Sequence, residues 1–433
     1  MTRVALLASG RLSRLSPDLL ASLLDRGGGE SSELSDDVAA LLADVASRGD
    51  VALREMAQRF DGVTLDVLEV PRAEWEAALV ALDPAVRSAL ERADRNITSF
   101  HAAQRPQEVV FDVEPGVRVT RVSRPLDSVG VYAPGGRAAY PSSVLMGVAP
   151  AKALGVNTVI VCSPPSASGR PPTEVLAACA IAGADRLLSV GGAGAIAALT
   201  FGTESIPAVD AIVGPGNRWV TEAKRQVAGR VLIDSPAGPS EILVIADASA
   251  DPTLVALELI AQAEHDPDAA CVLVTTSPVV ADGTLAALAR LIDTAPRAEV
   301  VRAAFAKAGA VLTTDSLDEA FAFANRYAPE HLSLMTAGAT ADARRVTTAG
   351  TTFVGASASV AFGDYMTGAN HVLPTGGRAR SFSGLSAQHF LRSYTIQEIT
   401  PDGARAMAED VVRLAEAEGL PGHAAAAAAR GNV

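Results

Sequence analysis

Two short segments of this 433-residue chain bring side chains of metal-binding or acid–base type together. Gln262 and His265 stand three residues apart in a helix expected over 251–265, so both project from one face. An oxygen and a nitrogen donor in this arrangement can hold zinc, although an ordinary surface pair has the same spacing. Glu330 and His331 follow another expected helix, and an adjacent carboxylate and imidazole can act as two separate acid–base groups at neutral pH.

Other candidate ligands lie outside the expected helices. Asp364 and His371 belong to a long polar stretch, and long loops of this kind are often functional. His423 follows Glu418-Gly-Leu-Pro-Gly, a break between two expected helices. Imidazoles and a carboxylate that converge from separate segments suit a tetrahedral or octahedral metal site. Spacing in the sequence leaves open whether these groups converge.

Three glycine-containing turns follow expected strands and offer backbone N–H groups to a phosphate: Tyr132-Ala-Pro-Gly-Gly136, Gly191–Ala197 and Gly214-Pro-Gly-Asn217. The second contains Gly192-x-Gly194-x-x-Ala197, a formal match to the dinucleotide fingerprint, in which a helix N-terminus faces the pyrophosphate. No acidic residue ends the next strand, and any tight strand-to-helix turn favours glycine, so a structural role is the alternative. Together the turns indicate a ligand crevice at the carboxyl ends of the strands.

The elements that must position these residues alternate from about residue 125 onward. Short β-branched apolar runs alternate with helical stretches, which predicts an α/β fold with parallel sheets covered by helices. The expected strands are 128–132, 158–162, 186–190, 211–213, 241–245, 271–275, 311–313 and 352–354. The expected helices between them include 141–154, 173–182, 218–227, 251–265 and 317–327.

The flanking regions have a different pattern. The first 125 residues read mostly as helix, and the stretch from about Ser381 reads as helix ending in an alanine-rich tail. Glycine and proline place a joint between two α/β units at Ser235–Ser240.

Composition excludes several classes of protein. Hydrophobic residues make up 49% and charged residues 20%, which excludes a disordered chain, a collagen and a coiled coil. A net charge of −13 argues against nucleic acid and anionic membranes as partners, and no apolar run reaches the ~18 residues that span a bilayer. Cys162, Cys179 and Cys271 are interpreted as small buried hydrophobes. The N-terminal residues lack a leader pattern, so a cytoplasmic location is expected.

Nine strings reveal a resemblance: VGVYAPGG, MGVAPAKALG, VGGAGAIAAL, GPGNRWVTEAKRQV, DSPAGPSEILVIAD, AQAEHDPDA, YAPEHL, GDYMTGANHVLPTGG and AEGLPGH. In order and spacing they resemble the histidinol dehydrogenase family over nearly the whole chain. The resemblance implies an NAD-dependent enzyme that oxidises a small amino alcohol, L-histidinol, through histidinal to L-histidine in histidine biosynthesis. It also implies one Zn²⁺ and the use of two NAD⁺ per site.

The resemblance assigns roles to individual residues where the family motifs match. The implied zinc ligands, which also contact substrate, are Gln262, His265, Asp364 and His423. The implied acid–base pair is Glu330 and His331, and His331 contacts substrate together with Ser240 and Glu418. The implied nucleotide contacts are Tyr132 and Asn217.

One cofactor position departs from the family pattern. The family usually has glutamine there, as in GGAQAIA, and this chain has Gly194. That glutamine contacts the cofactor in the family, and glycine has no side-chain amide to replace it. The mode or strength of NAD binding is therefore in doubt, and the same glycine creates the formal fingerprint match noted above.

The resemblance also implies an architecture. Two incomplete Rossmann-like parallel-sheet units are expected, with a helical N-terminal region and a helical C-terminal tail that is exchanged within a homodimer. The expected domains are 1–124 (helical), 125–238 (nucleotide side), 239–380 (metal and acid–base residues) and 381–433 (tail). With an exchanged tail, Glu418 and His423 would reach the partner's site, and the active sites would be shared.

Two other functions compete with this one. A paralogous zinc- and NAD-dependent dehydrogenase would act on another small alcohol, such as a sulfonated diol. Glu418 is available to meet a substrate cation, which favours an amine-bearing substrate. A zinc hydrolase would use Glu330 to activate a metal-bound water without a nucleotide. The glycine-containing turns argue against that hydrolase, and Gly194 argues slightly for it.

Overall fold

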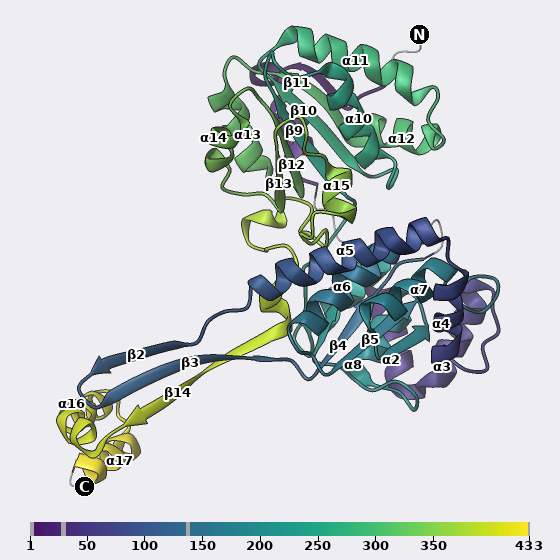
Figure 1. Cartoon of the computed structure of the whole chain (residues 1–433). Coiled ribbons are helices and arrows are strands. Elements are labelled where there is room, and N and C mark those ends of the chain that lie inside the picture. Colours follow the sequence, from purple (N-terminus) through teal and green to yellow (C-terminus); the bar gives the residue numbers. More distant parts are fainter. Residues whose placement is uncertain (1–3, 27–31, 136–138, 432–433) are drawn as a thin grey trace. The chain divides into compact units, whose positions relative to one another are not determined.

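The computed structural model describes residues 4–26, 32–135 and 139–431. They form two compact units, the first made of Met1–Ala103 with Asp127–Phe390 and the second of Gln104–Leu126 with Leu391–Val433. The first unit contains two parallel sheets flanked by helices (Figure 1). The second contains an antiparallel sheet and two helices. Each unit is described by itself.

The first parallel sheet of the first unit has the strand order β6-β5-β4-β7-β8. Its strands are β4 (Ser128–Tyr132), β5 (Thr158–Ser163), β6 (Arg186–Ser189), β7 (Ala211–Val213) and β8 (Leu232–Ile233). The connecting helices are α6 (Pro141–Ala153), α7 (Thr173–Ala182), α8 (Gly192–Phe201) and α9 (Arg218–Val227).

The second parallel sheet has the order β1-β11-β10-β9-β12-β13. Its strands are β1 (Ala8–Arg11), β9 (Glu241–Ala246), β10 (Ala270–Thr275), β11 (Gly309–Thr313), β12 (His331–Met335) and β13 (Thr351–Val354). Its helices are α10 (Pro252–Ala263), α11 (Pro278–Ile292), α12 (Ala298–Ala308), α13 (Leu317–Tyr327), α14 (Ala339–Asp342) and α15 (Val360–Tyr365).

The two parallel sheets repeat one topology. Counted along the chain, β4–β8 and β9–β13 both have the spatial order 3-2-1-4-5, and β1 adds to the edge of the second sheet by pairing with β11. The order reverses between β4 and β7 in one sheet and between β9 and β12 in the other. Such switch points open a crevice beside the strand ends. Each sheet therefore offers one place for a ligand.

Both faces of the second sheet are buried, as unbroken apolar strands require. On β9, Ile242 and Val244 pack towards α10, α11 and α12, and Leu243 and Ile245 pack towards α1 and α13. The free cysteines Cys162, Cys179 and Cys271 are buried, and burial raises the pKa of each thiol, which confirms their interpretation as buried hydrophobes.

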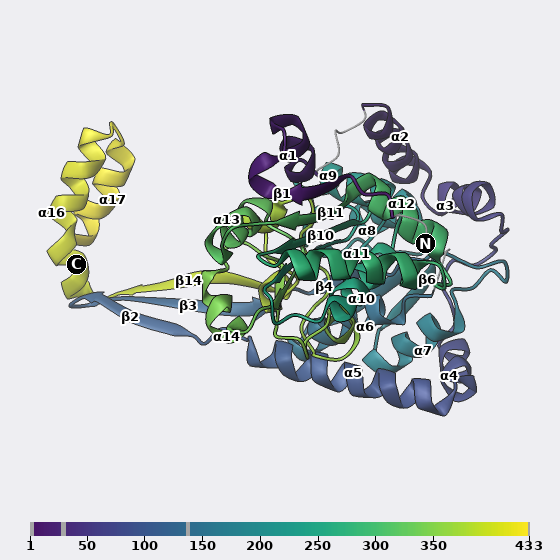
Figure 2. The same ribbon diagram turned by 90° about the horizontal axis from the view of Figure 1, so that it is seen from above.

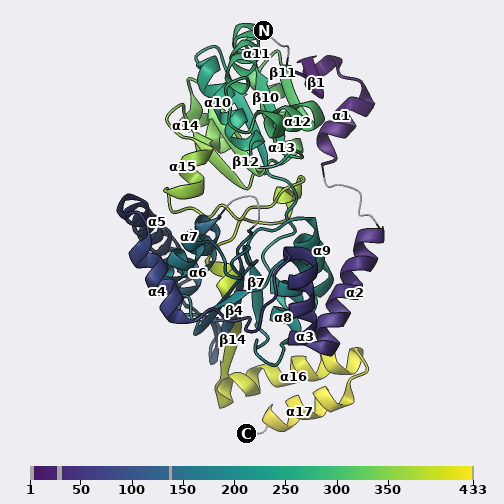
Figure 3. The same ribbon diagram turned by 90° about the vertical axis from the view of Figure 1, so that its right-hand side faces the viewer.

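Five helices come from the N-terminal part of the chain: α1 (Pro17–Leu24), α2 (Ser32–Arg48), α3 (Asp50–Met56), α4 (Arg72–Ala81) and α5 (Pro84–Ala103). Helix α2 packs beside α8 and α9 on the first sheet (Figure 3). Helix α1 packs instead against the second sheet with α13. The N-terminal helices thus divide between the cores of the two sheets.

The second unit contains β2 (Val109–Glu114), β3 (Val117–Pro125), β14 (Leu391–Ile399), α16 (Pro401–Ala417) and α17 (Pro421–Gly431). The strands pair antiparallel in the order β14-β3-β2, and α16 and α17 lie side by side as a helical hairpin (Figure 2). The sheet joins the hairpin at two facing glycines. A Cβ at Gly116 would lie 2.3 Å from Thr400 Oγ1, and a Cβ at Gly403 would lie 2.7 Å from the Gly116 oxygen.

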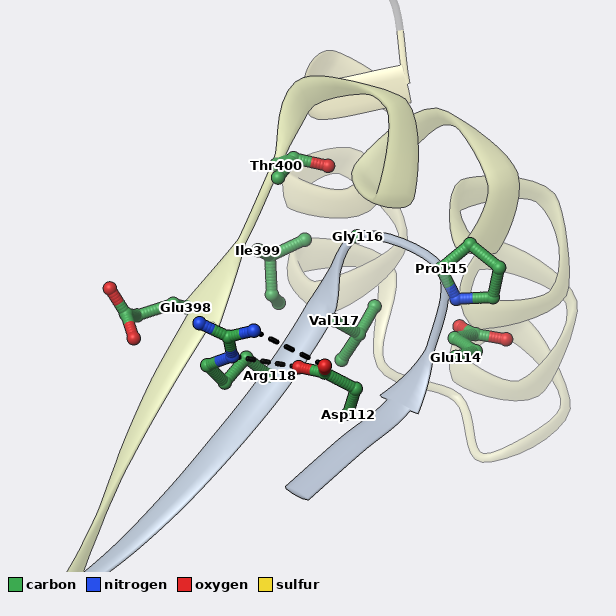
Figure 4. A pocket seen from close by; sticks show the side chains of 9 residues that line it. All are labelled: Asp112, Glu114, Pro115, Gly116, Val117, Arg118, Glu398, Ile399 and Thr400. Atoms are coloured by element: carbon green, nitrogen blue, oxygen red, sulfur yellow. Dashed lines mark hydrogen bonds and ion pairs between the residues drawn. The ribbon is translucent and has the colours of Figure 1, made fainter. Parts of the chain in front are cut away.

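The second unit has little core of its own. Its buried hydrophobic residues, among those described, are Val122, Leu126, Leu391, Ala415 and Ala424. Large exposed apolar side chains are more numerous: Val109, Val110, Phe111, Val113, Tyr394, Ile396, Ile399, Val411, Leu414 and Leu420. A hollow beside the hairpin turn has a mixed polar and apolar lining, and the exposed Arg118 guanidinium forms a two-point ion pair with Asp112 there (Figure 4).

Most expected elements of the two parallel sheets are confirmed. Strands β4 and β7 and helices α7, α9 and α13 have the expected bounds, and the other expected strands agree within two residues. Strand β12 was missed because Glu330-His331 was interpreted only as a segment after a helix. Gly136 lies outside the described residues.

The expectation of helix was wrong for three stretches outside the parallel sheets. β2, β3 and β14 lie in regions that were read as helical. The residues of β2 and β14 are largely exposed, so neither strand shows the apolar–polar alternation of a half-buried strand, although β2 begins with the apolar run 109–111. Strand β3 is mixed, with Thr120 and Val122 buried. The four expected domains stay a prediction.

Among the described helices, none is long and apolar enough to cross a membrane.

Candidate active site

Glu330 and His331 stand at the entry to strand β12. Helix α13 ends at Tyr327. The next residue, Ala328, adopts the left-handed conformation (φ 51°) and is the one residue other than glycine with positive φ among those described. The chain then turns sharply, and His331 becomes the first residue of β12. Both side chains are buried, with 5% and 3% exposure. The turn therefore places an acid and an imidazole inside the protein.

The backbone of Glu241 holds both groups. Glu241 begins β9, which pairs with β12, and its N–H donates to Glu330 Oε2 over 2.7 Å. Its carbonyl oxygen accepts a hydrogen bond from His331 Nδ1 over 2.8 Å. A carbonyl oxygen can only accept, so Nδ1 carries the proton and Nε2 presents a lone pair. One residue thus orients the carboxyl group and fixes the tautomer of the imidazole.

His331 has the properties of a proton acceptor. Burial lowers its pKa to about 4, although the Glu241 carbonyl opposes this shift. The ring is therefore neutral at physiological pH. Nε2 has no hydrogen-bond partner among the described residues, and it lies 4.0 Å from Asp364 Oδ1. A buried lone pair of this kind is available to a bound substrate.

Burial acts in the opposite direction on Glu330. It raises the pKa of this carboxyl group well above the usual range, against the effect of the Glu241 N–H group, and the charges of Glu241 and Asp364 add to it. A raised pKa makes the carboxylate form a stronger base than an exposed glutamate. A cation bound nearby would shift the group back towards that form.

Asp364 is positioned by a neighbouring carboxylate. It lies on α15, and Glu258 of α10 accepts hydrogen bonds at the start of α15 from Val360 N (2.7 Å) and Ser359 Oγ (2.8 Å). Burial raises the pKa of Asp364 to about 7, and the charge of Glu258 adds to the effect. Two acidic groups so close together favour a cation between or beside them.

Gln262 lies on α10 one turn after Glu258, and His265 comes two residues after the helix. Gln262 is fully buried, and neither atom of its carboxamide has a hydrogen-bond partner among the described residues. An unpaired buried amide is costly unless a ligand satisfies it. His265 follows the helix end and is exposed. Partial burial lowers the pKa of His265. A positive charge on His265 would in turn lower the pKa of His331 and of His371.

These donors fit a metal ion. Gln262, His265 and Asp364 combine an amide oxygen, an imidazole and a carboxylate, a donor set that zinc accepts. The described residues contain no cluster of three or more His, Cys, Asp or Glu side chains arranged for a metal. The three expected ligands of the first unit supply only two side chains of those types, His265 and Asp364, because Gln262 is an amide. The fourth expected ligand, His423, is exposed on α17 of the second unit.

His371 was a candidate ligand from its place in a long polar stretch, although the resemblance assigned it no role, and it belongs to the same site. It lines the pocket that also contains His331 and Asp364, and its Nδ1 donates to the Asp364 carbonyl oxygen over 3.0 Å. Burial lowers its pKa to about 4. The only signal in the sequence was its place in the string GDYMTGANHVLPTGG, between Asp364 and the loop that follows.

The expected nucleotide contacts lie at the carboxyl ends of β4, β6 and β7. The Tyr132 hydroxyl accepts a hydrogen bond from Gly192 N over 3.2 Å. The Asn217 side-chain oxygen caps α9 by accepting from Trp219 N and Val220 N. The N-terminal ends of α8 and α9 therefore open at this edge of the sheet, where backbone N–H groups favour an anion.

Gly194 faces the protein core. A Cβ at this position would lie 3.0 Å from Met56 Sδ and 3.3 Å from Leu53 Cδ2. A larger side chain would therefore press against α3. Gly194 lies in the first turn of α8, so it could contact a nucleotide only through its backbone.

The other expected substrate contacts are divided between the units. Ser240 immediately precedes β9 and is half-buried, next to the residue whose backbone holds Glu330 and His331. Glu418 ends α16 of the second unit and is exposed. The first unit thus brings together Ser240, Glu330 and His331, and Glu418 and His423 belong to the second.

Comparison with known proteins defines the class of this protein as a dehydrogenase. The profile of the family described as histidinol dehydrogenase matches residues 24–431. The chain belongs to the histidinol dehydrogenase family.

Its relatives match over nearly their whole length. The chain is 46% identical to a histidinol dehydrogenase of Methanosarcina mazei, with 97% of each chain covered. It is 45% identical to one of Streptomyces avermitilis, covering 95% of this chain and 94% of that one. The crystal structure of histidinol dehydrogenase from Elizabethkingia anophelis superimposes with a TM-score of 0.94 at 34% identity, over 99% and 98% of the two chains.

Proposed function

We propose that this protein oxidises L-histidinol through histidinal to L-histidine, using NAD⁺ and a bound zinc ion, as a step of histidine biosynthesis. The observation that carries the proposal is the buried, neutral His331, whose Nε2 lone pair faces Asp364 in a chain of this family. The balanced reaction converts an alcohol, two NAD⁺ and one water into a carboxylate, two NADH and three protons.

The absent groups supply two functions when bound: NAD⁺ accepts hydride, and zinc orients the substrate and offsets negative charge. Gln262, His265 and Asp364 would hold the metal together with His423. The edge of the first sheet around Tyr132 and Asn217 would hold the nucleotide, with Gly194 contributing only backbone.

The residues of the chain move the protons. In the first step His331 Nε2 takes the hydroxyl proton as hydride leaves the carbinol carbon. The aldehyde is then hydrated: the carboxylate form of Glu330 takes a proton from the attacking water, and His331 returns its proton to the carbonyl oxygen, which frees Nε2 again. In the second step His331 takes a proton from the hydrate as the second hydride leaves. The Glu241 backbone keeps both groups oriented throughout.

The second unit supports a homodimer as the active form. Four large apolar side chains on β2 are more than half exposed: Val109, Val110, Phe111 and Val113. β2 is also an edge strand of a three-stranded sheet with few buried residues. Such a surface is unstable in water unless another chain covers it. We propose that a second copy does so and that Glu418 and His423 serve the partner's site.

The experiment is direct. Purified protein is given limiting L-histidinol with excess NAD⁺, and NADH is counted. Two NADH per histidinol are expected, with loss of activity on zinc chelation and recovery on adding zinc. One NADH per substrate, or turnover of a sulfonated diol in preference to histidinol, would refute the proposed reaction. Hydrolysis without NAD⁺ would indicate the hydrolase instead.

A further inference from the structure

Arg26 is a buried cation, and it lies about 300 residues before Glu330 and His331 in the sequence. It follows helix α1, and its side chain is 8% exposed. All of its donor nitrogens are engaged. Nε and Nη2 donate to the two carboxylate oxygens of Glu241 (3.0 and 3.1 Å), and Nη2 also donates to the Tyr327 carbonyl (2.9 Å). Nη1 donates to the carbonyls of Leu23 and Leu24.

This guanidinium connects strand β9 to the end of helix α13, which leads into β12. Glu241 is the first residue of β9, and Tyr327 is the last residue of α13, just before the turn to Glu330. The guanidinium also lies over the Tyr327 ring, 3.3 Å from its centroid. Arg26 therefore fixes the Glu241 side chain relative to the helix end that leads into β12.

Glu241 needs this anchor because its backbone makes the two hydrogen bonds that hold the acid–base pair. Its N–H group binds Glu330, and its carbonyl binds His331. Its side chain has one further partner, Gly376 N, at 2.7 Å. Removing Arg26 would leave a buried carboxylate with one remaining hydrogen bond, and such a group moves towards water or draws it in. Either response displaces the backbone at the start of β9.

We propose that Arg26 is a positioning residue for the reaction, acting through Glu241 to hold Glu330 and His331 in their reactive orientation. The proposal rests on the proposed acid–base roles of those two residues. The requirement is for the planar fork of arginine. A lysine ammonium is a single point and cannot span both carboxylate oxygens and the Tyr327 carbonyl.

The test compares three variants of the full-length, zinc-loaded enzyme. Arg26→Met removes the fork, and Arg26→Lys keeps the charge. Arg186→Met is the matched control, because Arg186 makes the same two-point contact to Glu69, plus one to a carbonyl, in the first sheet. Rapid mixing with saturating NAD⁺ and histidinol, or histidinal, gives the rate constant and the amplitude of the first NADH formation. KM values come from steady-state turnover.

The rate constant separates positioning from folding. Loss of folded enzyme lowers the amplitude only, whereas displaced groups lower the rate constant at constant amplitude. A displacement of about 1 Å can cost up to about 10²-fold. We expect Arg26→Met to lower the rate constant at least about 10-fold on both substrates, with KM within about twofold. Arg26→Lys should lose several-fold, and Arg186→Met should stay within twofold.

Each contrary result overturns the proposal. If Arg26→Met lowers only the amplitude, or leaves the rate constant within twofold, Arg26 has a structural role alone. If Arg26→Met does not fold, Arg26→Lys provides the test. A wild-type rate constant for Arg26→Lys would then refute the requirement for the planar guanidinium. If the wild type itself does not oxidise histidinol, the proposed function fails before Arg26 is tested.

Discussion

The two units of the molecule hold their expected site residues in opposite ways. In the first unit Glu330 and His331 are buried and fixed by the Glu241 backbone. In the second, Glu418 and His423 are exposed on a helical hairpin attached to a sheet with little core. The contrast teaches that a single chain can complete the acid–base pair by its own folding, whereas the tail residues serve a site only through the association that we propose.

The largest effect is expected at the buried imidazole. His331→Ala removes the proton acceptor of both hydride steps, so turnover of histidinol and of histidinal should each fall by about 10²–10⁴. The measurement is kcat on each substrate, with circular dichroism to check folding. His389→Ala is the control, because His389 lies in the first unit and bonds only within its own turn among the described residues. A fall of less than tenfold for His331→Ala would contradict its role.

Glu330→Gln should separate the two steps. Only the aldehyde stage consumes a water, so histidinal oxidation should fall by about 10²–10³ while histidinol-to-histidinal conversion falls much less. The amide keeps an acceptor for the Glu241 N–H group, so the local structure should persist. The ratio of the two rates measures the effect. Equal losses on both substrates would end the division of roles between Glu330 and His331.

Complementation between two inactive variants tests the tail residues of the second unit. His331→Ala and His423→Ala are each expected to be inactive, and subunit exchange between them should restore activity if the tail serves the partner. Random 1:1 mixing makes half the dimers hybrids, each with one intact site of two, so about a quarter of wild-type activity is expected. Native mass spectrometry reports the hybrids. Hybrid dimers with background activity would show that His423 serves its own chain.

A smaller effect concerns metal content. His265→Asn removes the exposed imidazole donor and should lower bound zinc to well below one per chain after dialysis. His389→Asn is the control and should keep the wild-type content. Zinc is measured by elemental analysis of the purified proteins. Wild-type zinc in His265→Asn would remove that residue from the ligand set.

The smallest effects compare ion pairs in the two units. Hydrogen bonds from Arg225, with help from Gln226 and Ser35, lower the pKa of Glu222 to about 2, against the effect of burial. A lowered pKa stabilises the fold above the unfolded pKa, and that stabilisation is lost as pH falls from about 4.5 towards 2. Glu222→Gln should cost about 1 kcal/mol at neutral pH, the figure discounted for the exposed Arg225, and less than half of that at pH 3.

Asp112→Asn is the matched change in the second unit. Its ion pair with Arg118 is exposed, so no measurable change in unfolding midpoint is expected at either pH. Thermal melts of both variants against wild type provide the measurement. Equal losses for Glu222→Gln and Asp112→Asn would contradict the difference in burial.

Local pattern predicted the parallel sheets well. Alternating apolar runs and helices define β4–β7 and β9–β11 almost residue by residue, because those strands are largely buried, whereas the short and partly exposed β8 was not predicted. The same reasoning failed for β2 and β14, because the apolar run of β2 and the scattered apolar residues of β14 are exposed and lie outside the alternation of strands and helices. Nor does a sequence reveal that β1 pairs with β11, because that contact joins segments about 300 residues apart.

The site was predictable in its residue types and not in its geometry. Gln262–His265 and Glu330–His331 were visible as close pairs, and the family motifs supplied their roles. The part played by Glu241 was invisible, because it acts through backbone groups that every residue has. Glu258 was missed for a related reason. Its carboxylate caps a helix about 100 residues later, and no local spacing signals that contact.

The facing glycines at the joint of the second unit have an evolutionary consequence. Gly116 and Gly403 leave no room for a side chain on either surface, so a larger residue at either position would push the two segments apart. We therefore expect residues 104–126 and 391–431 to diverge together among relatives, although some 260 residues separate them in the sequence. Chimeras between relatives should keep the joint only when both segments come from the same parent.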